Sequence, residues 1–231
     1  MDLFSDYRER RSDSPLVERV QQARVASTGS TIRPAEVHWH MVLARYRGEA
    51  RLVLAGPLTS SGVVSVPEGA ELLWIKLKLG AFMPHLPARH MLDTETTLPG
   101  AASNSFWLYG SAWQFPDYEN VDTFVNRLVA EEVLAHDPLV NDVLQDRPPE
   151  LSVRTIRHRF LRATGLTQGQ IRQFGRAQQA AGLLQQGATI LDTVDEAGYY
   201  DQPHLTRSLR HWIGHTPAQI LSARAMAEIA V

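Results

Sequence analysis

The chain has 231 residues, of which 25 are acidic, 23 are basic and 44% are hydrophobic, a composition typical of a globular protein. It contains no cysteine, which excludes disulfides, thiolate catalysis and cysteine-ligated zinc. The sequence has no run of about 18 apolar residues that would indicate a membrane span, and its charged N-terminus lacks the apolar stretch of a secretory signal. We therefore expect a cytoplasmic protein without membrane contact.

The N-terminal half changes character twice. Residues 1–30 predict a polar lead-in with one short helix over Pro15–Val25. Residues 31–118 contain short runs rich in β-branched residues between Gly and Pro turns, which is typical of antiparallel strands in a small sandwich or barrel. From Asn120 onward apolar residues recur every three or four positions, so residues 119–136 predict a connecting helix.

A helix over about residues 152–164 is the first candidate for a helix that reads DNA. Ser152 is a good N-cap and Gly165 a good C-terminal stop. Ile156 and Phe160 are four residues apart and share one face, which we expect to be buried. The other faces carry basic side chains near the helix start, where a helix-turn-helix contacts base edges in the major groove.

A helix over about residues 202–213 is the second candidate. Asp201 provides its N-cap, and Leu205 and Leu209 repeat the buried pair spaced by four residues. A short amphipathic helix precedes it, with Ile190, Leu191, Val194 and Ala197 on the apolar side that we expect to be buried, and a turn at Gly198 follows that helix. This order of helix, glycine turn and capped helix is typical of a helix-turn-helix.

A predicted helix over residues 168–186 joins the two candidates and is about 28 Å long. One turn of B-DNA measures about 34 Å, so this linker suits two helices in successive major grooves. Residues 150–224 contain nine Arg and five acidic residues, a balance of +4 within a chain of net charge −2. From the pattern alone, a plain helical bundle with a solvated basic face is the alternative.

Two segments carry a resemblance to a known family. They are Ser152 to Phe160 with Gly165-Leu166-Thr167, and Ala197 to Arg207 with Gly214-His215-Thr216-Pro217; Arg176 and Ala180 match the linker helix between them. Over roughly residues 137–221 the chain resembles the AraC/XylS family of bacterial transcription regulators. The resemblance implies double-stranded DNA as the partner, no enzymatic activity, and a β-rich, cupin-like effector or dimerisation domain before the DNA-binding half.

The expected fold class is accordingly α+β. A small N-terminal antiparallel β domain, a cupin-like sandwich or barrel, would be followed by an all-α tandem helix-turn-helix DNA-binding domain over residues 137–231. Two departures from the family pattern concern the first motif. Gln168 stands where the family usually has proline, and the turn Arg147-Pro148-Pro149-Glu150 is shorter and richer in proline than usual. We therefore expect the first motif to depart most from standard geometry.

The helix faces assign DNA contacts to two groups of side chains, most of them Arg, whose planar fork suits guanine edges and phosphates. The predicted base contacts are Arg154, Arg157, His158, Gln202, Thr206 and Arg207. The predicted backbone contacts are Ser152, Arg162, Arg172 and Arg210. No catalytic residue, metal ligand or cofactor is predicted.

The alternative function is a cupin-like small-molecule- or metal-binding protein with a helical extension that does not read DNA. His38 and His40 would share one face of a strand, as metal ligands can, but the carboxylate that the cupin pattern requires a few residues later is missing. Aromatic residues could line an effector pocket, although they more commonly form core: Trp74, Phe106, Trp107, Trp113 and Phe115.

A further alternative is a ligand-binding or oligomerisation module whose helical half no longer reads DNA. An effector of unknown chemistry is one additional candidate partner. A second copy of the chain, paired through the apolar stripe of the helix at residues 119–136, is another. That stripe could equally pack on the β domain of its own chain.

Overall fold

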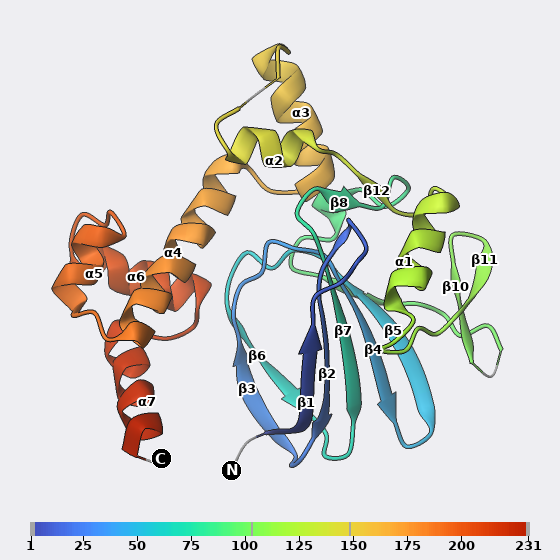
Figure 1. Cartoon of the computed structure of the whole chain (residues 1–231), viewed down its shortest axis with the longest axis horizontal. Coiled ribbons are helices and arrows are strands. Elements are labelled where there is room, and N and C mark those ends of the chain that lie inside the picture. Colours follow the sequence, from blue (N-terminus) through green and yellow to red (C-terminus); the bar gives the residue numbers. More distant parts are fainter. Residues whose placement is uncertain (1–2, 103, 148, 230–231) are drawn as a thin grey trace. The chain divides into compact units, whose positions relative to one another are not determined.

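The computed structural model describes residues 3–102, 104–147 and 149–229 (Figure 1). The chain forms two compact units. Unit 1 consists of Met1–Thr31, Val37–Pro57 and Ser65–Thr167, and unit 2 consists of Ile32–Glu36, Leu58–Val64 and Gln168–Val231. The expected α+β class, an antiparallel β region followed by a helical region, is confirmed.

Unit 1 is built on a six-stranded antiparallel sheet. In spatial order its strands are β1 (Phe4–Arg10), β2 (Val17–Val25), β7 (Glu71–Leu77), β4 (His40–Tyr46), β5 (Glu49–Ala55) and β9 (Glu95–Thr97). Two two-stranded pairs accompany it: β8 (Ala81–Phe82) with β12 (Ala135–His136), and β10 (Ser105–Leu108) with β11 (Ser111–Gln114). A third pair, β3 (Gly29–Arg33) with β6 (Gly62–Val66), has residues in both units.

The predicted lead-in is part of this sheet, because its residues form β1 and β2; residues 1–2 lie outside the described part. The predicted helix Pro15–Val25 is therefore wrong. In β2 a register shift between Val17 and Arg19 inserts an extra residue, so Val17 and Val20 both reach the core. The resulting spacing of three imitates a helical period, although the backbone is extended.

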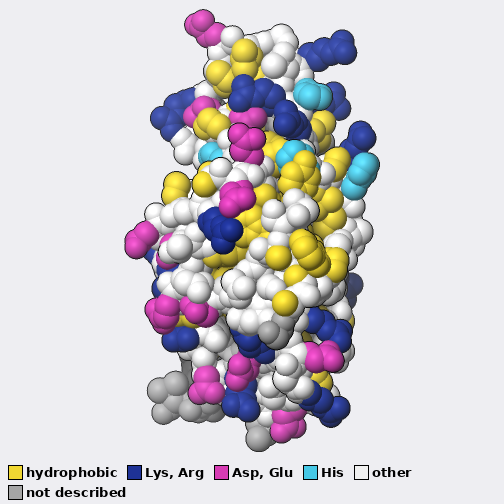
Figure 2. All heavy atoms as spheres, turned by 90° about the vertical axis from the view of Figure 1, so that its right-hand side faces the viewer, with side chains coloured by type: hydrophobic (Ala, Val, Ile, Leu, Met, Phe, Trp, Pro, Cys, Tyr) yellow, Lys and Arg dark blue, Asp and Glu magenta, His cyan; other side chains and the backbone are white. Residues whose placement is uncertain are grey.

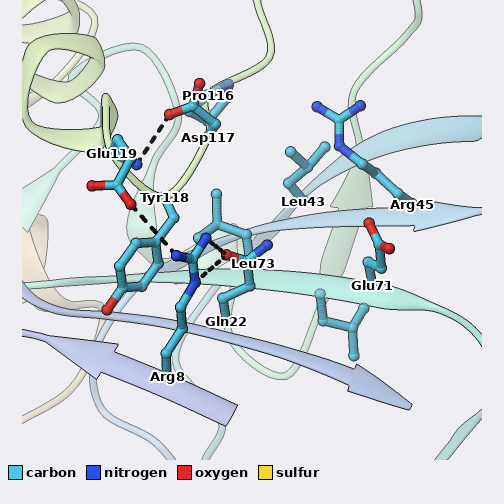
Figure 3. A pocket seen from close by; sticks show the side chains of 11 residues that line it. Arg8, Gln22, Leu43, Arg45, Glu71, Leu73, Pro116, Asp117, Tyr118 and Glu119 are labelled. Carbon is cyan, nitrogen blue, oxygen red and sulfur yellow. Dashed lines mark hydrogen bonds and ion pairs between the residues drawn. The ribbon is translucent and has the colours of Figure 1, made fainter. Parts of the chain in front are cut away.

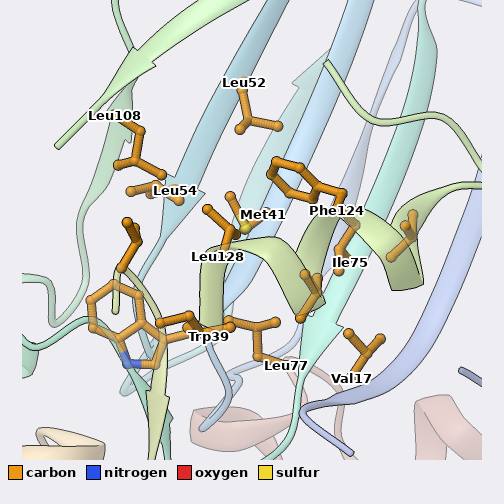
Figure 4. Close-up of a cluster of buried hydrophobic side chains, with 14 of the residues drawn as sticks. Val17, Trp39, Met41, Leu52, Leu54, Ile75, Leu77, Leu108, Phe124 and Leu128 are labelled. Atoms are coloured by element: carbon orange, nitrogen blue, oxygen red, sulfur yellow. The ribbon is translucent and has the colours of Figure 1, made fainter. Parts of the chain in front are cut away.

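The main core of unit 1 lies between one face of the sheet and helix α1 (Val121–Ala130) (Figure 4). The strand register places Met41 opposite both Leu54 and Ile75, and these three side chains are essentially inaccessible to solvent. Phe124 and Leu128, one turn apart on α1, join the same cluster. A helix thus forms within the predicted range of residues 119–136, and its apolar stripe packs on the chain's own sheet. It ends at Ala130, however, and Ala135–His136 form strand β12, so the predicted C-terminal end is wrong.

The segment after α1 returns to the sheet before the helical region begins. Ala135 pairs with Phe82 in the β12–β8 ribbon, and the Asp137 N–H donates to the Gly80 carbonyl at 2.9 Å. Helices α2 (Leu139–Leu144) and α3 (Val153–Thr164) follow, and α3 packs on α2, on β8 and on the short 3-10 helix η1 (Ala88–His90). The first predicted DNA-reading helix therefore belongs to unit 1.

Unit 2 contains helices α4 (Gln168–Gln186), α5 (Ile190–Glu196), α6 (Gln202–Trp212) and α7 (Pro217–Ile229). The bounds predicted for the linker helix agree with those of α4. Leu184, Leu205, Leu209 and Ile220 are buried together in its core. Within the described residues, no helix combines the length and the apolar character needed to cross a membrane.

Two segments from the β-rich half of the sequence complete unit 2. The N–H of Ala35 donates to the Trp212 carbonyl at 2.7 Å, and the N–H of Ser61 donates to the His211 carbonyl at 2.7 Å. The Ser61 hydroxyl donates to the Arg210 carbonyl at 2.9 Å. These bonds satisfy carbonyl groups that the last turn of α6 cannot pair within the helix.

The predicted division at residue 137 differs from these units, since unit 1 continues to Thr167 and unit 2 includes residues from the β-rich half. The complete predicted division is into residues 1–30, 31–118, 119–136 and 137–231. That these ranges are separate domains stays a prediction.

We predict that Gly165→Ala destabilises unit 1 by about 2–3 kcal/mol, because it combines backbone strain with a steric clash. Gly165 has a φ of 72°, and a Cβ there would lie 3.0 Å from the Ala88 carbonyl oxygen. Gly48→Ala is the matched control, since Gly48 has a φ of 80° but open space around it. Urea unfolding should show a loss of about 1 kcal/mol for the control; equal losses for the two variants would contradict the close packing of α3 on η1.

Candidate nucleic-acid interface

Helix α3 begins and ends as its sequence predicts. The Thr155 N–H donates to the Ser152 hydroxyl oxygen at 3.1 Å, and Gly165 closes the helix in the left-handed conformation. Phe160 is buried and Ile156 is partly buried, so the predicted apolar face is the one that packs. Ser152 was predicted to contact the DNA backbone, and its hydroxyl oxygen accepts the hydrogen bond of this cap.

The opposite side of α3 is exposed and basic. Arg154, Arg157 and His158, the predicted base contacts on this helix, are all exposed, and so is Arg162. On the face shown in Figure 2, basic side chains and histidines lie toward the upper end, where α2 and α3 are, interspersed with a few acidic ones. The first turn also presents Val153, an apolar residue outside the predicted contacts that is 82% exposed.

Arg159, between these residues in sequence, has a structural role. Its Nε and Nη2 groups donate to the two carboxylate oxygens of Asp137 at 3.0 and 2.6 Å. The hydrogen bonds first, and then the negative charge of Asp137, raise the pKa of Arg159. This pair joins α3 to the segment that leaves the β12–β8 ribbon, so Arg159 positions the helix.

Helix α6 is held in the same manner. The His204 N–H donates to the Asp201 carboxylate at 2.7 Å, which confirms Asp201 as the N-cap. Leu205 and Leu209 have exposed fractions of 0%, which confirms the predicted buried pair. The Gly214 N–H donates to the Leu209 carbonyl at 3.0 Å, and the helix ends before this glycine.

The remaining side of α6 is accessible. Gln202 and Arg207, predicted base contacts, are exposed, as is the predicted backbone contact Arg210, whereas Thr206 is partly buried. Tyr200, in the turn just before the N-cap, is 90% exposed. Tyr200 was not among the predicted DNA contacts, although its position in the sequence, directly before the N-cap of α6, could have indicated it.

Helix α4 holds the turn that precedes α6. The Arg176 guanidinium donates to the Gly198 carbonyl at 3.2 Å and lies 5.2 Å from the centre of the Tyr199 ring. Burial raises the pKa of Tyr199, whose hydroxyl is 2.9 Å from that of Ser208. Arg176 therefore supports the geometry of the second motif. The predicted backbone contact Arg172, also on α4, is exposed.

Helix α5 differs in one respect from its prediction. Val194 and Ala197 are buried as expected, but Leu191 is 69% exposed. Thr193 is buried in addition, and its hydroxyl donates to the Thr189 carbonyl at 2.8 Å. The buried stripe of this short helix is therefore rotated away from Leu191.

The turn of the first motif runs from the end of α2 at Leu144 to the start of α3 at Val153. Asp146 has a positive φ of 55°, and the Arg147 N–H donates to the Asp142 carbonyl at 2.8 Å. Pro148, one of the two prolines on which the expected departure rests, lies outside the described residues. That the first motif departs most from standard geometry stays a prediction.

His38, one of the two histidines considered as metal ligands, lies beside a carboxylate. His38 precedes strand β4 rather than lying within it, and its Nε2 is 3.0 Å from the Glu18 carboxylate. Glu18 also lies 3.6 Å from the Lys76 ammonium group. Across the described part of the chain, no three His, Asp or Glu side chains are grouped so as to hold a metal.

The aromatic residues considered for an effector pocket are dispersed. Phe106 and Trp113 are buried in the main core with Phe115, Trp74 stacks edge-on against Phe4 at 5.9 Å, and Trp107 is exposed.

One cavity of unit 1 lies beside Arg8 and measures about 120 Å³ (Figure 3), below the roughly 300–1,000 Å³ of small-molecule sites. The Arg8 guanidinium there is bound to Gln22 and Glu119 and lies 4.0 Å from the Tyr118 ring centre.

Comparison with known families identifies the helical region. Residues 150–223 match a family model described as a helix-turn-helix domain, of the AraC type. This segment covers both α3 and α6, and it confirms the resemblance to the AraC/XylS family regulators. The chain accordingly has the domain of a DNA-binding transcription regulator of the AraC type. Neither the curated proteins nor the solved structures contain a significant match to this chain.

We predict that Asp201→Ala destabilises the protein by about 1 kcal/mol, because the His204 N–H loses its capping acceptor. Asp201→Asn is the matched control, since the amide oxygen can still accept this hydrogen bond. Chemical denaturation of both variants checks the prediction. If the two variants lost the same stability, charge rather than capping would account for the effect.

Proposed function

We propose that this protein is a sequence-specific, DNA-binding transcription regulator in which α3 and α6 read base edges in successive major grooves. The observation that carries the proposal is the shared construction of the two helices. Each begins at a side-chain N-cap, buries an apolar face, and leaves polar and basic side chains exposed on the other side. That construction is what a helix needs in order to enter a major groove while it stays attached to its domain.

The length of α4 supports the proposed placement of the two reading helices in successive major grooves. Its 19 residues extend about 28 Å, close to the roughly 34 Å repeat of B-DNA. A linker helix of this length is suited to separating two reading helices by about one turn of the duplex.

The exposed side chains divide by the chemistry of their contacts. We assign base edges to Arg154, Arg157 and His158 on α3, and to Gln202, Thr206 and Arg207 on α6. Ser152, Arg162, Arg172 and Arg210 are assigned to phosphates. Contacts with phosphates provide affinity that depends on salt, whereas contacts with base edges determine the sequence that is bound.

The proposed role is regulatory rather than enzymatic, and a genomic DNA partner implies a cytoplasmic location in a bacterial cell. A small-molecule effector and a homodimer stay predictions.

Selection from random double-stranded DNA tests the proposed function. The full chain, incubated with the library at low and at moderate salt, should enrich one sequence whose conserved positions fall in two groups. Recovery of unenriched DNA at both salt concentrations would support instead a module that no longer reads DNA.

We predict that Arg207→Ala lowers affinity for the selected sequence and relaxes discrimination at one base pair by about 1–3 kcal/mol, because a bidentate contact with a base edge is lost. Arg210→Ala, on the same exposed side of α6, is the matched control. It should weaken binding to all sequences about equally, as expected for a phosphate contact. Competition titrations against single-base variants of the selected site measure both effects; unchanged discrimination in Arg207→Ala would contradict its assignment.

A further inference from the structure

A basic pocket lies between α3 and η1 within unit 1. Its walls are Pro87–Arg89 on one side and His158, Leu161, Arg162 and Gly165 on the other, and its volume is about 420 Å³. Among the described residues that line it, Arg89, His158 and Arg162 can carry positive charge and none is acidic. We refer to it as the η1–α3 pocket.

The two walls of the η1–α3 pocket are closely fitted. A Cβ at Gly165 would lie 3.0 Å from the Ala88 carbonyl oxygen and 3.1 Å from the Leu92 side chain, so α3 and η1 are in tight contact there. Because Arg89 follows Ala88 directly, its backbone is fixed relative to α3. The Arg89 Nε group donates to the His90 Nε2 at 3.3 Å, which orients the guanidinium.

The pocket opens on the side of α3 that the proposed function assigns to DNA. His158 is a proposed base contact and Arg162 a proposed phosphate contact, and both are exposed. The Arg162 guanidinium lies 5.4 Å from the Phe82 ring centre, a cation–π distance that keeps it beside the pocket. Arg159, by contrast, is held by Asp137. Arg89 therefore adds a cation to the exposed edge of α3 from outside the helix.

We propose that the η1–α3 pocket binds an anion of the phosphate class, and that the backbone of the bound DNA supplies it. Arg89, from the β-rich half of the sequence, then forms part of the interface with α3. Arg89 and Arg162 both line this cavity, and no carboxylate is among its described lining residues. A phosphate bound there would balance the charge of the two guanidinium groups. This inference rests on the proposed function.

The test measures how affinity for the selected DNA depends on salt. Each phosphate contact contributes about 0.9 to the slope of log affinity against log salt. When salt rises from about 50 to 200 mM, Arg89→Ala should therefore lose about 3.5-fold less affinity than the natural protein. The same change in slope is expected for unrelated DNA, because a phosphate contact carries no sequence information.

Two further variants serve as controls. Arg51→Ala removes an exposed Arg of strand β5 that is paired with Glu49 and should keep the natural slope. Arg89→Lys retains the charge and should restore most of the slope. Thermal unfolding of each variant verifies that it is folded.

Three outcomes would overturn the proposal in distinguishable ways. If Arg89→Ala binds DNA with the slope of Arg51→Ala, the pocket makes no DNA contact although the proposed function stands. If that slope is unchanged but inorganic phosphate raises the melting temperature of the natural protein more than that of Arg89→Ala, the pocket serves a free anion. If the natural protein binds no DNA, the proposed function fails together with this inference.

Discussion

A helix that reads DNA has to be held by one face and by its ends, because the opposite face must stay accessible. Both α3 and α6 are built in a way that meets this constraint. Phe160 holds α3, and Leu205 with Leu209 holds α6, each from the buried side. Side chains at the N-terminal ends satisfy backbone N–H groups that would otherwise lack partners.

The supports of the two helices come from distant parts of the sequence. In unit 1, α3 rests on η1 and β8 and is joined by Arg159 to Asp137. In unit 2, the carbonyl groups at the end of α6 accept hydrogen bonds from Ala35 and Ser61. Each helix of the helix-turn-helix domain is thus completed by residues of the β-rich half. The β-rich half is therefore a structural component of the proposed interface as well as a candidate sensor.

Local signals in the sequence predicted the helices well. The caps at Ser152 and Asp201, the stop at Gly165 and the bounds of α4 depend on residues within a few positions of each other, and all are confirmed. Strand β2 was mistaken for a helix because its register shift changes the spacing of buried residues. The sequence shows that apolar residues recur three positions apart in this segment. It does not show that a β-bulge, rather than a helix, produces this spacing.

Contacts between residues far apart in the sequence could not be predicted, because no local pattern indicates them. Nothing around Ser61 indicates that its N–H and hydroxyl bind the end of α6. Arg89 lies in the short helix η1, directly after Pro87 and Ala88, and its position beside α3 follows from the packing of Gly165 against Ala88. Burial of Leu191 was expected from its position on α5, whereas the tertiary packing of α5 buries Thr193 instead.

Hydroxyl-radical footprinting of the full chain on its selected DNA is the most direct test of two reading helices. If α3 and α6 both enter major grooves, two protected patches should appear on one face of the duplex, with centres about 10 base pairs apart. Protection of a single patch, unchanged by substitutions on α3, would contradict the account by showing that α6 alone reads the DNA.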